Sequence, residues 1–212
     1  MKTVAYISAI SSILPFIAGL IKFRSAGKTS RLIIFYFMIC VIVECVSFYL
    51  THNKTNNNLL ADIFYMVEGL ILITFFYLIF NEKDFFYPAI ILSASYLGYG
   101  LYTTIFDPGP YAYNSNFRTG ESLVIQALSA YSLIRYSKME NGNLLQNTEF
   151  WLSAGLFIYY SVNIAIFFTA TFFVDETTQV MRKTWIIHSV VNTLVNLIFT
   201  FGLTCIPSKQ PR

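Results

Sequence analysis

Charged residues are scarce in this sequence. They make up 12% of its 212 residues, whereas a typical soluble domain has about 25%. Hydrophobic residues account for 56% of the chain and aromatic residues for 18%. A water-soluble fold of this length could not hide so much apolar surface, so a soluble single domain is excluded. We expect the lipid bilayer to be the solvent of this chain.

Cysteine and histidine are also rare, which excludes several kinds of site. The three cysteines fall within apolar runs (Cys40, Cys45 and Cys205) and have neither a CxxC metal spacing nor an extracellular pairing pattern. The two histidines, His52 and His188, are too few for the three-histidine zinc site of membrane hydrolases of the ceramidase and adiponectin-receptor type. We predict no metal site and no cofactor. An enzyme would need a metal or an acid/base pair, and Glu68 with His188 is the pair that the sequence offers.

Other absences narrow the class of membrane protein. The net charge of +3 comes without a clustered basic face, so we predict no nucleic-acid partner. The last apolar run has Asn192 at its middle and no lysine there, which excludes a retinal pigment. No Pro-Gln dipeptide occurs, which argues against sugar transporters built from two three-helix repeats and a linker helix.

Seven apolar runs are present, and each is long enough to cross a hydrocarbon core of about 30 Å as a helix. They are Val4–Ile21, Leu32–Leu50, Leu59–Phe80, Phe85–Phe106, Phe117–Tyr136, Phe150–Phe173 and Thr184–Ile206. The connections between them are short and polar. The fifth run is the weakest, because Arg118, Glu121, Gln126 and several serines interrupt it; we expect its neighbours to shield it from lipid. The sequence therefore predicts an all-α polytopic membrane protein, with residues 1–212 forming one domain of seven transmembrane helices in a single bundle.

The loop cations predict the orientation of the chain. Nine of them would lie on one side of the membrane (Lys22, Arg24, Lys28, Arg31, Lys83, Arg135, Lys138, Lys209 and Arg212) and five on the other (Lys2, Lys54, Arg118, Arg182 and Lys183). Cytoplasmic loops carry the excess of Lys and Arg. We therefore predict an outside amino terminus and an inside carboxy terminus in the inner (cytoplasmic) membrane of a bacterium.

Polar residues of different runs fall at a similar depth, in the predicted outer half. They form helical stripes, such as Asp62, Tyr65 and Glu68 at three-residue spacing, while the inner half is nearly all Phe, Leu and Ile. These residues predict a polar cavity that opens outward above an apolar plug. The candidate lining residues are Glu44, Asp62, Tyr65, Glu68, Glu121, Tyr160, Asn163, His188 and Asn192.

Several roles are open for these polar residues. An acid at the centre of a span costs about 2.5–3.5 kcal/mol on insertion scales, so Glu44 and Glu68 are functional candidates. They could instead join helices by hydrogen bonds, couple to protons or ions, or bind a metal with His188. For Glu121 the spacing favours an ion pair with Arg118 at the rim. For His188 it favours a hydrogen bond to a neighbouring acid.

Five segments carry a resemblance that extends loosely over nearly the whole chain. They are "ILPFIAGLIKFRS", "IVECVSFYL", "IFYMVEGLILITFFY", "FWLSAGLFIYYS" and "WIIHSVVNTLVNLIF". In these segments the chain resembles a group of small bacterial seven-helix membrane proteins of unknown function. The resemblance implies the seven-span topology and carries no activity to particular residues.

The function that we predict is binding or sensing of a small molecule or lipid in the outer cavity. The tail after Ile206 is short, so we expect any signal to pass through a membrane or cytoplasmic partner protein. A secondary transporter that uses Glu44 and Glu68 for coupling is one alternative. An intramembrane lipid hydrolase is the other, and an enzyme is the less favoured class.

Overall fold

The computed structural model describes residues 2–55, 57–80, 83–106, 115–138, 143–172 and 178–207. Within these ranges every regular element is a helix. They are α1 (Lys2–Ser11), α2 (Ile13–Lys22), α3 (Lys28–His52), α4 (Asn58–Phe80), α5 (Lys83–Phe106), α6 (Ser115–Ser137), the short 3₁₀ helix η1 (Leu144–Gln146), α7 (Thr148–Phe172) and α8 (Thr178–Thr204). The prediction of an all-helical chain is confirmed.

Each predicted apolar run corresponds to a helix, and the first run is divided in two. The break falls at Ser12, between α1 and α2. Pro15 has no backbone N–H to bond the carbonyl four residues earlier, so the helical ladder is interrupted at this point. Six helices are long and apolar enough to cross a membrane, with α1 and α2 counted together; α6 does not meet that standard.

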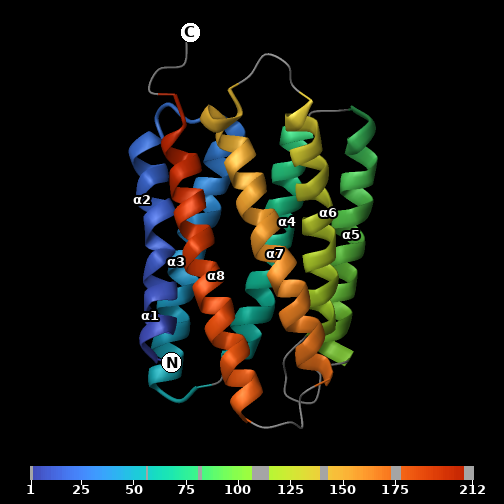
Figure 1. Ribbon diagram of the computed structural model, residues 1–212. Helices are drawn as coiled ribbons and strands as arrows, with labels where there is room; N and C mark the ends of the chain where they lie inside the picture. Colours follow the sequence, from blue (N-terminus) through green and yellow to red (C-terminus); the bar gives the residue numbers. More distant parts are fainter. Residues whose placement is uncertain are drawn as a thin grey trace.

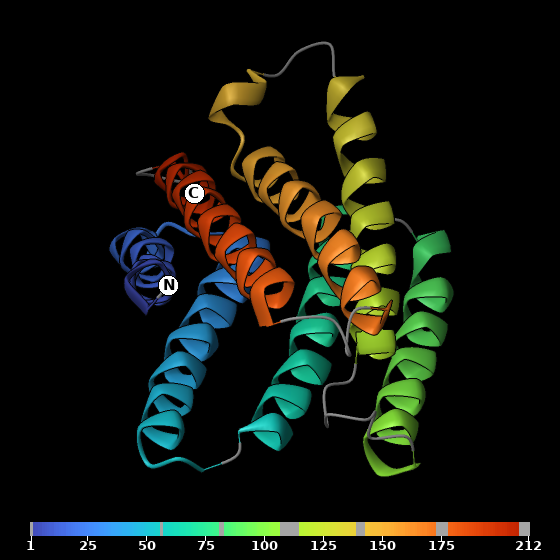
Figure 2. The same cartoon turned by 60° about the horizontal axis from the view of Figure 1, so that its bottom comes forward.

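The helices form a ring of side-by-side neighbours (Figures 1 and 2). Around the ring, α2 packs against α3, α3 against α4, α4 against α6, α6 against α7, and α7 against α8, which returns to α1 and α2. Helix α5 lies outside the ring and packs mainly on α4. A ring of this kind encloses a central space whose character depends on the side chains that point inward.

The two ends of the ring differ in how tightly they are filled. The upper end in Figure 1 contains the α2–α3 connection, and the lower end contains the start of α1. All buried residues of α3 lie in its upper part, between Ser30 and Phe37. From Met38 to His52 none of its residues is buried. In α4, Phe75, Phe76 and Phe80 are likewise buried at the upper end. The core therefore closes the upper half of the ring.

Helix α6 hides its polar residues against its neighbours. The hydroxyl groups of Ser122 and Ser129 donate to backbone carbonyls one turn earlier in α6. Ser132 of α6 and Ser153 of α7 are fully buried, and their hydroxyl oxygens lie 2.9 Å apart. Small side chains allow these two helices to approach closely. The polarity of this run thus reflects a shielded face, as the sequence predicts.

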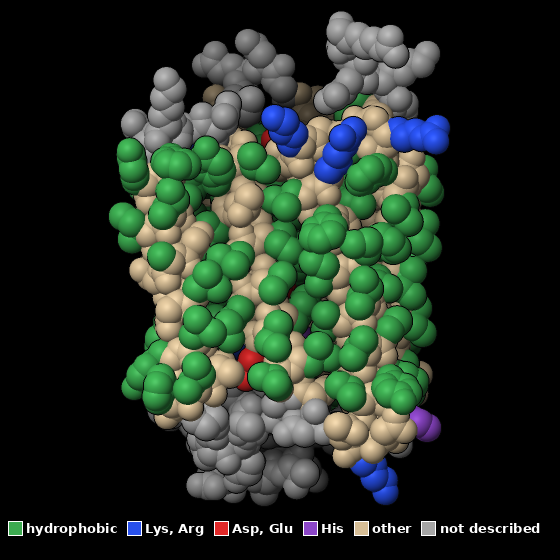
Figure 3. Space-filling view, turned by 180° about the vertical axis from the view of Figure 1, so that it is seen from behind, with side chains coloured by type: hydrophobic (Ala, Val, Ile, Leu, Met, Phe, Trp, Pro, Cys, Tyr) green, Lys and Arg blue, Asp and Glu red, His purple; other side chains and the backbone are tan. Residues whose placement is uncertain are grey.

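The outer surface between the two ends is apolar. On the face shown in Figure 3, hydrophobic side chains cover the middle of the bundle and cationic side chains gather at its upper edge. Large exposed side chains occur on every long helix, for example Ile42 of α3, Ile91 of α5 and Leu194 of α8. Even α6 exposes Leu123 and Ile134. Such a surface suits a hydrocarbon environment.

The contact between α4 and α5 can be tested at a glycine. A Cβ added to Gly69 would lie within 2.5 Å of the Tyr96 hydroxyl oxygen, which donates to the Tyr65 carbonyl at 2.6 Å. We expect Gly69→Ala to displace Tyr96 and to lower the free energy of unfolding by about 1–3 kcal/mol. Unfolding in mixed detergent micelles, with increasing denaturing detergent, measures this change.

The matched control is Gly98 of α5, because an added Cβ there meets nothing within 4 Å. We expect Gly98→Ala to be neutral or to stabilise the protein slightly through its higher helix propensity. Equal losses of stability for the two variants would contradict close packing at Gly69.

Candidate functional site

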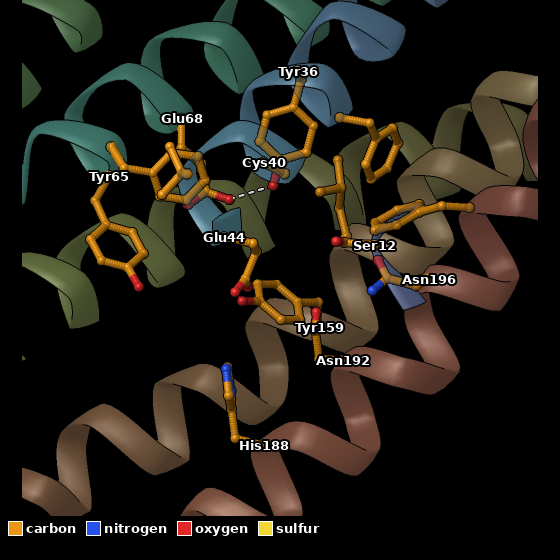
Figure 4. A pocket seen from close by; sticks show the side chains of 15 residues that line it. Ser12, Tyr36, Cys40, Glu44, Tyr65, Glu68, Tyr159, His188, Asn192 and Asn196 are labelled. Atoms are coloured by element: carbon orange, nitrogen blue, oxygen red, sulfur yellow. Dashed lines mark hydrogen bonds between the residues drawn. The ribbon is translucent and has the colours of Figure 1, made fainter. Parts of the chain in front are cut away.

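A cavity of about 130 Å³ lies inside the ring (Figure 4). Its walls come from five of the ring positions: the α1–α2 break, α3, α4, α7 and α8. The described residues that line it are Ser12, Tyr36, Phe37, Cys40, Val43, Glu44, Phe64, Tyr65, Glu68, Leu156, Tyr159, His188, Asn192, Asn196 and Phe199. Residues far apart in the sequence therefore meet in one space, as an outward-facing cup requires.

The cavity has a buried floor and a more open mouth. At the floor, Tyr36, Glu68 and Asn196 are each less than 10% exposed. Toward the lower end, Glu44 is exposed and His188 is half-buried. Because α3 runs downward and α8 upward, these residues follow one another in depth along both helices. The opening is therefore at the lower end, where α3 leaves the core.

Glu68 is held at the floor by a tyrosine. The Tyr36 hydroxyl donates to Glu68 Oε1 at 2.6 Å, and both side chains are buried. Hydrogen bonds to a charged group are short and are roughly twice as strong as neutral ones. The contact joins α3 to α4 and fixes the carboxyl group of Glu68 beside the cavity (Figure 4). A buried acid of this kind is stable only with such a partner.

His188 has a different partner from the one that its sequence context suggests. Its Nδ1 lies 3.0 Å from Oδ1 of Asn163 on α7, so the predicted hydrogen bond to an acid is wrong. An amide oxygen only accepts hydrogen bonds, so Nδ1 carries the hydrogen in this contact. In the neutral ring Nε2 then remains an acceptor. The side chain projects toward the space between Glu44 and Tyr159 (Figure 4).

Two amides of α8 are oriented by serines of α1. Asn192 Nδ2 donates to the Ser8 hydroxyl at 2.9 Å, and Asn196 Nδ2 donates to the Ser11 hydroxyl at 2.8 Å. Each bond joins the first helix to the last. With their amide nitrogens directed at α1, both residues keep their carbonyl oxygens as acceptors. These residues therefore combine helix–helix attachment with a position in the cavity wall.

Glu44 stands at the mouth of the cavity without a partner. The structure gives its carboxylate neither a hydrogen bond nor an ion pair with any described residue, and it is exposed. Glu44, Glu68 and His188 approach the same space, as the sequence analysis expects of a shared site. Tyr65 and Asn192 also line it, so five of the nine candidate residues meet in this cavity. Their role in binding stays a prediction.

The candidates on α6 and at the start of α4 lie elsewhere. Glu121 and Asp62 are buried but do not line the cavity. Arg118 is also buried, so the predicted rim location of a Glu121–Arg118 pair is wrong. The guanidinium carbon of Arg118 lies 3.5 Å from the centre of the Tyr65 ring, a close cation–π contact. A second group of polar residues thus lies between α4 and α6, and Tyr65 separates it from the cavity.

The two candidates on α7 do not line the cavity. Tyr160 and Asn163 are both 2% exposed, which shows that their shared face is buried. The cavity is lined instead by Leu156 and Tyr159. One residue along a helix turns the side chain by about 100°. Asn163 still acts on the site indirectly, because it orients His188.

Sequence reasoning missed several lining residues. Tyr36 precedes Cys40 and Glu44 at four-residue spacing, so a longer reading of that stripe could have found it. Ser12 lies at the helix break, where periodicity gives no direction. Phe37, Phe64 and Phe199 carry no polar signal at all. Among the described residues no group of three or more His, Cys, Asp or Glu side chains is arranged to hold a metal ion.

The bond between Tyr36 and Glu68 predicts a coupled stability loss. We expect Tyr36→Phe to lower the free energy of unfolding by about 1–3 kcal/mol, because it leaves a buried carboxyl group short of a donor. In a Glu68→Leu background the same change should cost much less. A double-mutant cycle in mixed micelles measures this coupling.

Tyr131→Phe serves as the control, because Tyr131 is exposed and its change should lie within about 0.5 kcal/mol of zero. If the losses for Tyr36→Phe and Glu68→Leu simply add, the bond does not contribute to stability.

Comparisons with known proteins identify no relative, so the cavity is the feature from which a function is argued. A scan against protein-family models, a search of curated proteins and a search of solved structures each find no match. The resemblance to small bacterial seven-helix membrane proteins stays a prediction.

Proposed function

We propose that this chain is an integral membrane protein with seven spans that binds a small molecule or a lipid head group in its lower cavity. In this proposal the amino terminus and the cavity mouth are outside, the carboxy terminus is inside, and a partner protein receives the signal. The observation that carries the proposal is the cavity itself. It gathers two carboxylates, two amides and an imidazole from three helices, in a bundle whose outside is apolar.

The apolar surface supports membrane insertion. Helix α3 has 25 residues, enough for about 37 Å at 1.5 Å per residue, which exceeds the hydrocarbon thickness of about 30 Å. Helix α6 is not among the six apolar candidate spans, and its polar residues, such as Ser132, are buried against its neighbours. Its exposed Leu123 and Ile134 support its inclusion as the seventh span.

The described cations support the orientation. Lys22, Arg24, Lys28 and Arg31 lie at the upper end, together with Arg135 and Lys138 at the end of α6. At the lower end the described side chains include Lys54 and Lys183. The excess at the upper end supports a cytoplasmic location for that end. The cavity would then face outward.

The closed upper half favours binding over transport. Phe75, Phe76 and Leu72 are fully buried above the level of Glu68. A transported solute needs access to the site from both sides. A one-sided cavity instead supports reception of a ligand from outside.

The orientation is tested with single cysteines in a variant that has Ser at Cys40, Cys45 and Cys205. We expect Lys54→Cys to react with a membrane-impermeant maleimide on intact cells. Lys28→Cys should react only after the cells are opened, because it lies at the opposite end. The reverse pattern would place the cavity mouth inside and overturn the proposed direction of ligand entry.

Occupancy of the cavity is tested with two substitutions on α3. Val43 lines the cavity, whereas Val46 is exposed and outside the lining. We expect native mass spectrometry of protein extracted in lipid discs to detect a bound small molecule. The bound mass should persist in Val46→Trp and disappear in Val43→Trp, where the indole fills the space. Equal occupancy in both variants would contradict binding in this cavity.

A further inference from the structure

The cavity has a one-sided charge character. Glu44 and Glu68 both line it, and no Lys or Arg is present among the described residues of its wall. Arg118 stands behind Tyr65 and outside the lining. In a low-dielectric bundle, carboxylates in a wall that has no Lys or Arg of its own attract a positive ligand. The charge of the wall therefore favours binding of a cation and disfavours binding of an anion.

The hydrogen-bonding groups of the wall point to the same ligand. Asn192 and Asn196 each use an amide N–H on α1, and His188 uses Nδ1–H on Asn163. The hydroxyl hydrogens of Tyr36 and Ser12 are also used within the protein. The acceptors left for a ligand are amide oxygens, the imidazole Nε2 and carboxylate oxygens, and they stand beside the second N–H of each amide and the Tyr159 hydroxyl. A ligand with several N–H donors matches the carboxylate oxygens and the other acceptors of this wall.

Aromatic rings complete the wall. They belong to Tyr36, Phe37, Phe64, Tyr65, Tyr159 and Phe199. Ring faces attract ammonium and guanidinium groups by cation–π interaction. The protein already makes this contact next to the cavity, where Arg118 lies over Tyr65 at 3.5 Å. Rings and carboxylates in one small space are a favourable environment for an organic cation.

The volume limits the size of the ligand. The cavity of about 130 Å³ is smaller than the roughly 300–1,000 Å³ of pockets for drug-sized molecules. A small polar group fits this space, and any longer tail would extend through the mouth beside Glu44.

We propose that the cavity is a site for a small primary ammonium group, held by Glu44 and Glu68 and surrounded by the aromatic wall. This proposal rests on the proposed binding function and specifies the chemistry of its ligand. The ammonium group can belong to a free amine or to the head group of an aminolipid. Both sources share the same contacts at the cavity and are separated by experiment.

The test measures binding of matched probes to the purified full-length chain in lipid discs. Propylammonium, propanol and propionate have similar size and differ in charge and donors. In discs of phosphatidylcholine, we expect propylammonium to raise the unfolding temperature in a saturable way. Propanol and propionate should have little effect. Tetramethylammonium should bind more weakly than propylammonium, because it has no N–H to offer the acceptors.

Glu44→Gln is the decisive variant, because Glu44 is exposed and its loss leaves the core intact. We expect it to weaken propylammonium binding by about tenfold or more. Glu149→Gln is the control, because it also removes one carboxylate. Glu149 lies at the opposite end of the bundle, where it accepts a hydrogen bond from the Tyr136 hydroxyl. It should leave the affinity unchanged.

The outcomes separate the two levels of the proposal. If propanol or propionate binds as well as propylammonium, or if Glu44→Gln has no effect, the ammonium site is wrong while a binding cavity stands. If none of the probes shifts the unfolding temperature, both are overturned. Discs that contain phosphatidylethanolamine identify the source: a reduced response to propylammonium there supports an aminolipid, and an equal response supports a free amine.

Discussion

The apolar exterior of the bundle obliges polar side chains to find partners inside it. A hydrocarbon surrounding offers no hydrogen bonds, so each inward polar group must be satisfied by a neighbouring helix or by its own backbone. Serines and threonines mostly use the carbonyl one turn earlier, as Ser129 and Thr193 do. Longer polar side chains must reach across to another helix. The contacts that join the ring follow from this requirement.

Three cross-helix contacts show how the requirement organises the site. Tyr36 on α3 reaches Glu68 on α4, His188 on α8 reaches Asn163 on α7, and Asn192 on α8 reaches Ser8 on α1. Each contact uses a donor, and Glu68, His188 and Asn192 each keep an acceptor atom that the contact does not use. The acceptors of the wall are therefore a consequence of how the helices are held together. Helix attachment and ligand chemistry are two uses of the same side chains.

The sequence was sufficient for the helices because their signal is local. Each apolar run corresponds to a helix, the break near Pro15 has a covalent cause, and the polar face of α6 is hidden as its composition requires. Helical spacing also gave the stripe that contains Glu68 and the stripe that contains His188. These features depend on residues within a few turns of one another.

Which residues line the cavity depends on which helices are neighbours, and the spacing of residues in the sequence does not show which helices are neighbours. Glu121 and Asp62 have the depth of a cavity residue, yet both are buried outside the cavity lining. The helical spacing predicts Tyr160 at the wall, whereas the structure places Tyr159, one residue earlier, in the lining. The depth of a residue follows from its position along a span, whereas the direction of its side chain depends on how the helices pack into the ring.

The upper half of α3 is packed in the core and its lower half is not, so ligand binding in the cavity could change the position of the lower half. Its upper part is fixed in the core through Ile33, Ile34 and Phe37, while no residue after Phe37 is buried in α3. A ligand held between Glu44 and the acceptors of α8 would add contacts where α3 has few. Binding energy would then favour one position of the lower half of α3 over others, and a ligand shifts an equilibrium only through such differential contacts. In the proposed function, a partner in the membrane would detect that shift on the outward side of α3, where Val46 and Tyr49 are exposed.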